Sequence, residues 1–290
     1  MLRLLLVILV VSLGFRMCRR YGSDLEVYIW DVGQGDAALI RFPGGKTMLI
    51  DAGGGFGEWD LGSRVLLPEL ARLGVLSLDI ALLSHPDQDH GYGFLGLWRE
   101  LRAGELWVNG REDLRHPKPL LRKLLRSASA ENVGVEFFNE VSERDIGGAR
   151  VRLFPLGTAG AASNNRTLAV LLEWKGVSFA FTGDMESDAE SAFFDRIDGP
   201  VTVLKVAHHG SRTSSFPAAL ARARPTWSVI SSGAGNHYGH PHVSVLERLQ
   251  NFDGGMLRTD FHGFAHFVVH EDGRLTCETG KGGCGVGRRE

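Results

Sequence analysis

The sequence predicts an α/β fold, and three observations support this prediction. Short runs of β-branched, aromatic and aliphatic residues recur along the chain, and segments with apolar residues at helical spacing stand between them. Glycine is frequent, with 38 residues, and many of these glycines lie in short loops between the runs. Several runs also end in aspartate or histidine. Because open α/β folds build their sites at the ends of strands, we expect the chemistry of this chain on strand-to-loop junctions.

The size and charge of the chain limit what it can be. A length of 290 residues allows a substantial buried core, in one large domain or two small ones. Apolar residues make up 43% and charged residues 23%, which is ordinary for a folded soluble protein. The formal net charge of −2 gives no global basic field. Binding to nucleic acid would therefore need a local basic patch.

The first half of the chain begins with three short β-branched or aromatic runs at 25–30, 37–42 and 46–50, separated by glycine-containing turns. The spacing of apolar residues predicts a helix over 61–73, which Gly74 ends. We then expect a strand ending at Leu83, a helix at 91–101, a strand at 106–108, a helix near 119–127 and strands near 135–138 and 151–154.

The second half begins with a hairpin, in which strands at 168–174 and 178–181 flank a turn at Lys175 and Gly176. Apolar spacing predicts helices and short strands in alternation after it. We expect helices at 185–197, 217–223 and 243–249, and strands at 201–206, 227–230, 256–258 and 264–269.

The N-terminal segment has the pattern of a targeting signal. A short basic start is followed by about a dozen apolar residues at 4–15, which is too short for a comfortable membrane span. We expect residues 1–22 to be a signal or membrane-anchor segment of an exported (periplasmic or extracellular) or membrane-anchored protein. The alternative is a misassigned start or a buried N-terminal strand, in a protein that stays in the cytoplasm.

One domain is expected over 23–275, because no repeat and no linker divides this region. Residues 276–290 are rich in glycine and charge, and we expect a flexible tail there. Cys277 and Cys284 lie close enough in sequence to form a disulfide in an oxidising compartment.

A cluster of metal-ligand residue types follows the apolar run at 78–83. His85, Asp87, Asp89 and His90 lie within six residues. Alternate residues of an extended chain point the same way, so the first three side chains can converge on one volume. Zn²⁺ and Mn²⁺ accept such a mixed set of imidazoles and carboxylates. A polar loop whose histidines cap a helix is the alternative. The cluster favours metal-dependent hydrolysis.

Three further apolar runs lead into residues of the same types: Asp51, Asp184 and the pair His208-His209. If folding brings Asp87, Asp89 and Asp184 together, their carboxylates repel by about 4 kcal/mol per pair at about 4 Å and an effective dielectric constant near 20. A bound dication removes this cost. The carboxylates therefore indicate a metal site.

These motifs resemble a known family. His85-x-Asp87-x-Asp89-His90, Gly183-Asp184 and His208-His209-Gly210-Ser211 resemble the metallo-β-lactamase fold superfamily, whose signature is H-x-H-x-D-H. The sequence is more closely similar to the hydrolase domain of ComEC-type competence proteins, over about residues 26–270. The motifs that match in order are at 31–36, 51–53, 84–90, 164–165, 182–184, 208–215 and 238–242. The long apolar segments of the ComEC channel are not found in this sequence, so it looks like a stand-alone version of that domain.

The resemblance implies a four-layer αββα sandwich with a cleft for two metal ions at one edge. His85 and Asp87 would hold the first ion, Asp89 and His90 the second, and Asp184 would bridge the two. Asp87 stands where the superfamily has its second histidine. This departure makes the ligand set richer in oxygen, so Mn²⁺ competes with Zn²⁺.

Another departure concerns the superfamily's histidine between the first motif and Asp184. Asn164 or Asn165 stands there instead. We expect both asparagines to contact the substrate.

The last ligand is left open by the sequence. His208 ends a strand and could complete the second ion, and His240 in a glycine-flanked loop could reach the same point. One of the two would bind metal while the other protonates the leaving group. We assign Asp89 and His209 to catalysis, with His209 beside the ligands rather than among them. Residues expected to support the site are Asp51, Asp36, His237 and His242.

Ser211, Arg212 and Thr213 follow the histidines with two hydroxyls and a cation, which suits them to hold a phosphate oxygen. The alternative is that the serines of this segment cap the helix that begins near Pro217.

One local basic stretch stands out: Arg111, Arg115, Lys118, Arg122, Lys123 and Arg126. It is either the solvated face of a helix or a track for the backbone of single-stranded nucleic acid.

The function expected from these observations is a two-metal phosphodiesterase, a nuclease that acts on DNA, with single-stranded DNA or another phosphodiester as partner. A second hypothesis is an ester, thioester or β-lactam hydrolase on the same fold. A third is a non-catalytic extracytoplasmic DNA-binding module.

Overall fold

The computed structural model describes residues 22–112, 114–157, 164–252 and 254–284. The expected signal or anchor segment falls almost entirely on residues 1–21, outside the described residues. Within the described residues, no helix combines the length and the apolar character needed to cross a membrane.

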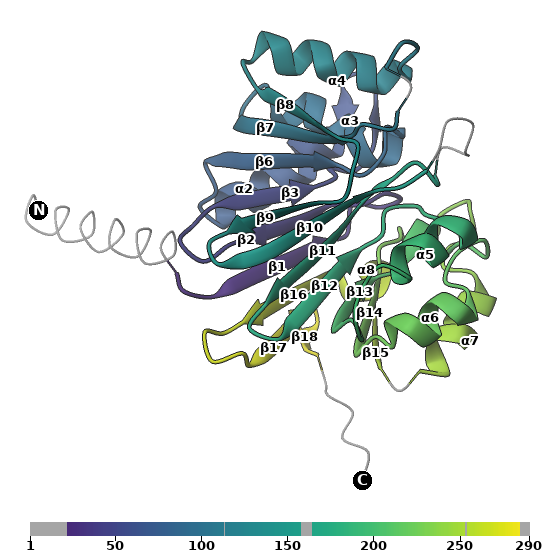
Figure 1. The fold of residues 1–290 in the computed structure, drawn as a ribbon. Coiled ribbons are helices and arrows are strands. Elements are labelled where there is room, and N and C mark those ends of the chain that lie inside the picture. Colours follow the sequence, from purple (N-terminus) through teal and green to yellow (C-terminus); the bar gives the residue numbers. More distant parts are fainter. Residues whose placement is uncertain (1–21, 113, 158–163, 253, 285–290) are drawn as a thin grey trace, which may run out of the picture.

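Two sheets form the centre of the molecule (Figure 1). The first has nine strands in the order β18-β17-β16-β1-β2-β3-β6-β7-β8, and the second has seven in the order β15-β14-β13-β12-β11-β10-β9. The strands of the first sheet are β1 (Leu25–Trp30), β2 (Ala38–Arg41), β3 (Thr47–Ile50), β6 (Ser77–Leu83), β7 (Arg102–Asn109), β8 (Gly134–Phe138), β16 (Phe264–Val269), β17 (Leu275–Thr279) and β18 (Gly282–Gly283). The strands of the second are β9 (Ser142–Ile146), β10 (Ala149–Pro155), β11 (Leu168–Trp174), β12 (Val177–Phe181), β13 (Val203–Lys205), β14 (Trp227–Ile230) and β15 (Gly255–Arg258).

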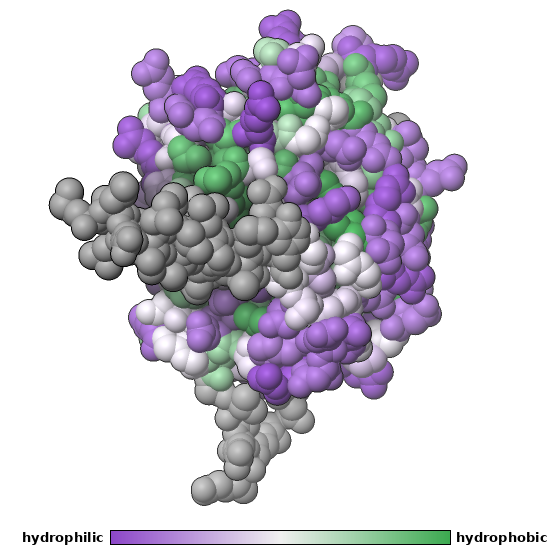
Figure 2. All heavy atoms as spheres, turned by 90° about the vertical axis from the view of Figure 1, so that its left-hand side faces the viewer, coloured by the Kyte–Doolittle hydropathy of each residue, from purple (hydrophilic) through white to green (hydrophobic). Residues whose placement is uncertain are grey.

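The strands are apolar on both faces because both faces are covered. In β1, Val27 packs into the core between the sheets, whereas Tyr28 packs into the core under the helices. In β11, Val170 and Leu171 divide in the same way between the inner core and the opposite helical layer. Period-2 alternation thus separates two buried faces instead of a buried and a solvated one. The surface drawn in Figure 2 is mostly hydrophilic, with smaller hydrophobic areas between.

Helices cover the outer face of each sheet, so the prediction of a four-layer αββα sandwich is confirmed. The layer on the nine-stranded sheet contains the π-helical turn η1 (Gly62–Leu66), α2 (Leu67–Arg72), α3 (Gln88–Leu97) and α4 (Pro119–Ala130). The layer on the seven-stranded sheet contains α5 (Ser187–Phe194), α6 (Pro217–Ala223) and α7 (Val243–Gln250). Smaller elements are the hairpin β4 (Gly55–Phe56) and β5 (Trp59–Asp60), the 3-10 turn η2 (Ala207–Gly210) and α8 (Thr259–His262).

Three expectations about the elements need correction. Helix α3 begins at Gln88 rather than at 91, which puts Asp89 and His90 in its first turn. Strand β9 was not expected, because its charged residues alternate on an edge strand. The flexible tail expected over 276–290 is wrong for 276–284, where β17 and β18 pair and Cys277 bonds to Cys284. Residues 285–290 lie outside the described residues.

The topology brings several loops to one edge of the sandwich. Strands β3, β6, β7 and β8 are parallel to one another, as are β12, β13, β14 and β15. Parallel strands place their carboxyl ends at the same edge of a sheet. The amide of Leu168 donates a hydrogen bond to the carbonyl of Ser84 (2.7 Å), which joins the two sheets at that edge. The loops after β3, β6, β12 and β13 therefore meet there.

Candidate metal centre

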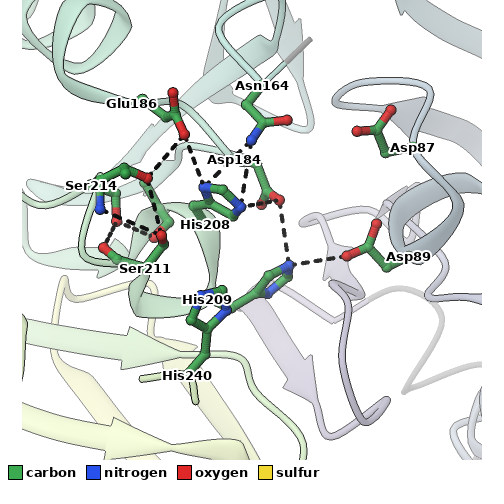
Figure 3. Close-up of polar contacts among 12 residues, drawn as sticks. Asp87, Asp89, Asn164, Asp184, Glu186, His208, His209, Ser211, Ser214 and His240 are labelled. Atoms are coloured by element: carbon green, nitrogen blue, oxygen red, sulfur yellow. Dashed lines mark hydrogen bonds and ion pairs between the residues drawn. The ribbon is translucent and has the colours of Figure 1, made fainter. Parts of the chain in front are cut away.

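Four side chains from three of these loops converge at the edge of the sandwich. Asp89 and His90 come from the first turn of α3, Asp184 from the loop after β12 and His209 from the loop after β13. One ligand atom of each lies within 4.8 Å of the others. His90 Nε2 is 3.2 Å from Asp184 Oδ1, and His209 Nε2 is 3.5 Å from both Asp184 Oδ2 and Asp89 Oδ2. Figure 3 shows His209 pointing between the two carboxylates.

The outer nitrogen of each imidazole is held by a protein acceptor. His90 Nδ1–H donates to Asp51 Oδ2 at 2.8 Å, and His209 Nδ1–H donates to the carbonyl of Ser231 at 3.0 Å. This fixes the tautomer in which each Nε2 lone pair faces the cluster. Asp51 also accepts hydrogen bonds from the amide (2.8 Å) and the hydroxyl (2.6 Å) of Ser84. Asp51 therefore braces the loop that carries the cluster.

His85 and Asp87 lie next to this cluster. His85 Nε2 is 3.7 Å from Asp87 Oδ2 and 3.9 Å from Asp184 Oδ2, and its Nδ1 is 3.0 Å from the hydroxyl of Ser84. Asp87 is the N-cap residue of α3 and forms an ion pair with Lys118. The carboxylate of Asp184 thus contacts both groups, with Oδ1 toward His90 and Oδ2 toward both His85 and His209.

The donor set fits a divalent cation. Among the described residues, His85 Nε2, His90 Nε2, Asp184 Oδ1 and His209 Nε2 are buried and have no hydrogen-bond partner. Buried polar atoms nearly always have such a partner, so four in one place require an explanation. A cation bound between imidazole nitrogens and carboxylate oxygens satisfies all four.

The electrostatics of the side chains lead to the same conclusion. Burial would lower the pKa of His90, but Asp184 and Asp51 raise it well above the usual range. Burial likewise opposes the charge of His209, whereas Asp184 and Asp36 raise the pKa of this imidazole well above its usual value. Burial raises the pKa of Asp184, but His90 and His209 lower it well below its usual range. The carboxylates thus stabilise positive charge in this buried volume, and a bound dication supplies such charge.

The structure places His209, rather than His208 or His240, among the converging atoms. His208 lies further out, with its Nε2 at 3.7 Å from Asp184 Oδ2 and its Nδ1 at 3.6 Å from Glu186 Oε1. His240 Nδ1 is 3.4 Å from the amide nitrogen of Gln34. The expectation that His209 stands beside the ligands, while one of the other two completes them, does not agree with this geometry.

An unusual backbone turns two neighbouring histidines toward Asp184. His208 and His209 have φ values of +50° and +52°, and Gly210 follows at +77°. Left-handed conformations cost residues other than glycine roughly 1–2 kcal/mol each. Such strain is typical of functional sites. In a regular strand two successive side chains point to opposite faces, whereas this backbone lets both histidines face the same region.

A buried ion pair lies behind His209. Asp36 and Lys205 are 6% and 4% exposed, and their charged groups are in contact. The other oxygen of Asp36 is 3.4 Å from His209 Nδ1. This contact agrees with the expectation that Asp36 supports the site. Lys205 was missed, although a lysine inside the apolar strand β13 was a usable signal, because a buried cation needs a partner.

The residues expected to contact the substrate lie around Glu186 and His208. Thr213 donates its hydroxyl to Glu186 Oε1 (2.9 Å), and Asn165 Oδ1 accepts the Glu186 amide (2.9 Å). Ser211 Oγ is 3.0 Å from Thr213 Oγ1. Asn164 Nδ2 is 3.5 Å from the ring nitrogens of His208 (Figure 3).

The N-cap alternative for the serines is wrong. The N-cap residue of α6 is Phe216, which makes no side-chain cap. The amides of Ser215 and Phe216 instead donate to the carboxylate of Glu190 at 2.6 and 3.1 Å. The side chain of Arg212 is exposed. His242 caps α7 by accepting the amide of Ser244, and the side chain of His237 is exposed.

Comparisons with known proteins agree with this architecture. A family model described as "Metallo-beta-lactamase superfamily" matches residues 30–233. The chain is 32% identical over 258 residues to ComE operon protein 3 of Bacillus subtilis (strain 168), over 83% of this chain and 32% of that protein. It is 26% identical over 253 residues to the competence protein ComA of Neisseria gonorrhoeae, over 87% and 33%. The chain thus spans about a third of the length of these relatives.

A solved structure shares the fold at low identity. The crystal structure of CmlA, a diiron beta-hydroxylase from Streptomyces venezuelae, is similar with a TM-score of 0.55 and 16% identity. The match covers 81% of this chain and 52% of CmlA.

Proposed function

Because the chain belongs to the metallo-beta-lactamase superfamily, as a metal-dependent hydrolase related to competence proteins, we propose that it is a two-metal phosphodiesterase that cleaves DNA. The observation that carries this proposal is the position of Asp184. Its carboxylate lies within 4 Å of imidazoles from two adjoining groups, His90 and His209 in one and His85 in the other. A carboxylate in this position is suited to bridge two ions.

The ligand assignment follows from the distances. His85 and Asp87 would hold the first ion together with Asp184. The second ion would be held by Asp89, His90, His209 and the same bridging carboxylate. Since three of the six side chains are carboxylates, Mn²⁺ competes with Zn²⁺ for the site.

Divalent ions in such a site lower the pKa of water toward about 7 and neutralise charge on a phosphoryl group. The residues of the chain supply the rest of the chemistry. His208 lies at the exposed side of the cluster, with its side chain 21% exposed and its ring held between Glu186 and Asn164. From this position it can donate a proton to the leaving oxygen of a phosphodiester. In place of His209 we therefore assign His208 as the general acid.

His240 is less suited to that role. Burial lowers the pKa of His240 to about 4, and the neighbouring His209 and His208 act in the same direction. The protonated form of its imidazole is therefore scarce at pH 7, which makes His240 a poor proton donor there. We assign His240 to contact with the substrate at the rim.

The DNA substrate is supported by the relatives and by the rim of the cleft. The relative ComA is named a competence protein, and 87% of the present chain matches it. Lys118 lies beside the proposed ligand Asp87, and the hydroxyl of Thr213 contacts Glu186, the neighbour of His208; a cation and a hydroxyl near the proposed ligands suit phosphate recognition.

The experiment is a cleavage assay with single-stranded DNA, using protein stripped of metal and reloaded with Mn²⁺ or Zn²⁺. We expect cleavage that depends on the metal and is lost in Asp89→Asn and Asp184→Asn. Asp188→Asn, an exposed aspartate four residues after Asp184, is the matched control and should cleave like the wild type. Turnover of nitrocefin or a thioester without DNA cleavage would move the assignment to a different hydrolase. DNA binding without any bound metal would indicate a non-catalytic binding module.

We also propose that the protein acts outside the cytoplasm, because Cys277 and Cys284 are bonded in a disulfide and such bonds persist in oxidising compartments. Alkylation of the protein in intact cells, followed by mass spectrometry, tests this. Blocked thiols support the proposal, whereas full alkylation of both cysteines contradicts it.

A further inference from the structure

A groove lies between helices α3 and α4, the first of which also carries the proposed ligands Asp89 and His90, and we propose that it binds a single strand of nucleic acid on its way to the metal centre. This inference rests on the proposed DNA substrate. The groove has a volume of about 500 Å³. Its lining includes Gly57, Tyr92 and Arg99 on one side and Lys123 and Arg126 on the other.

The charges in the groove favour a polyanion. Arg99, Lys123 and Arg126 are exposed, and none has a carboxylate within 4.0 Å among the described residues. Glu131 is the acidic residue of the lining. Three cations against one acid form a basic area on a chain whose formal net charge is −2. Phosphates along a nucleic-acid backbone would pair with such cations.

Aromatic side chains line and flank the same groove. The hydroxyl of Tyr92 donates to the carbonyl of Gly57 at 2.7 Å, and Lys123 Nζ is 6.0 Å from the centre of the Tyr92 ring. On the adjoining β4–β5 hairpin, Phe56 and Trp59 are 73% and 41% exposed and stack on each other at 5.9 Å. Exposed aromatic rings beside cations are what single-strand binders use, since every base can stack on them.

Helix α3 and the β4–β5 hairpin connect the groove to the metal centre. Residues of β4 and the segment before it pack on the first turns of α3. A Cβ at Gly54 would lie 3.3 Å from Asp89 Cα, and a Cβ at Gly55 would lie 2.6 Å from Tyr92 Cδ1. The hairpin therefore reaches from the proposed ligand Asp89 to the lining residue Tyr92. Helix α4 begins at the same end of α3, where Lys118 pairs with Asp87.

The distance from the metal centre to the far end of the groove suits a short segment of a strand. Helix α3 runs from Asp89 in its first turn to the lining residues Tyr92 and Leu95, and its ten residues span about 15 Å. At about 3.4 Å per stacked nucleotide this is about four nucleotides. The strand would run along the cations, past the aromatic pair and into the cleft.

The test measures binding of fluorescein-labelled oligothymidylate by fluorescence anisotropy, in EDTA and over a range of salt concentrations. Lys123→Gln/Arg126→Gln should weaken binding and reduce the slope of log K against log salt by about 1.4, since each phosphate contact contributes about 0.7. Phe56→Ala should weaken binding about fivefold or more through lost stacking. The matched control Lys175→Gln/Arg222→Gln removes the same two charges from the β11–β12 turn and α6, and should leave the slope unchanged.

Hydrolysis of bis(p-nitrophenyl) phosphate by the metal-loaded protein separates this inference from the proposed function. The groove variants should keep this activity, and their melting temperatures, while losing DNA affinity. If they bind and cleave DNA like the wild type, or if the control reduces the slope equally, the groove is not the binding site and the proposed function still stands. If no variant hydrolyses any phosphodiester but the slope changes as expected, the nuclease proposal fails and the groove is upheld as a binding site.

Discussion

The buried pair of Asp36 and Lys205 allows a quantitative test of how the site is supported. Lys205→Met removes the cation and leaves the Asp36 carboxylate 6% exposed, with only the neighbouring imidazoles to offset its charge. Removal of one partner from a buried pair costs about 3–5 kcal/mol, because the remaining charge stays out of water. Equilibrium urea unfolding, followed by circular dichroism, should show a loss of that size at an unchanged m-value.

Two companion variants make the result interpretable. Asp36→Asn/Lys205→Met removes both charges and should recover most of the lost stability, which gives a large coupling energy in a double-mutant cycle. Arg222→Gln breaks an exposed pair with Asp195 and should cost less than about 1 kcal/mol. The reasoning is refuted if Lys205→Met is as stable as Arg222→Gln, or if the double variant is no more stable than the single one.

Further predictions concern single side chains. Asp51→Asn should weaken metal binding about 10- to 100-fold in competition with a chelator, because Asp51 orients His90; unchanged affinity would contradict that role. Burial raises the pKa of Glu190 to about 7, so the folded state binds this proton more tightly than the unfolded state. The resulting contribution to the free energy of unfolding is lost as pH rises from about 4.5 through about 7. Glu190→Gln should remove a pH dependence of about 3 kcal/mol in the free energy of unfolding, and parallel curves for the two proteins would count against it. Gly93→Ala would place a Cβ 1.9 Å from the carbonyl oxygen of Ala52 and should lower the melting temperature, whereas a wild-type value would show that the close approach relaxes freely.

Much of the fold follows from local patterns in the sequence. Short apolar runs predicted β1, β3, β11 and β14 close to their observed bounds, because these strands are buried on both faces. Strand β9 was not predicted, because its residues Ser142–Ile146 are largely polar. They form a strand through pairing at the edge of the sheet. Whether such a polar segment becomes a strand depends on pairing with distant segments, which the local sequence pattern does not indicate.

The site was predictable in its residue types but not in its geometry. The motif from His85 to His90 and the residue Asp184 do meet at one edge. The choice between His208 and His209 depends on two successive left-handed residues, which a sequence cannot reveal for residues other than glycine.

The central claim is that this buried cluster binds divalent cations, and an anomalous difference map from crystals loaded with Mn²⁺ or Zn²⁺ tests it most directly. We predict one peak among Asp89, His90, Asp184 and His209, and a second beside His85 and Asp87. A map with no peak at these side chains, or with a peak bound instead by His240, would contradict the account.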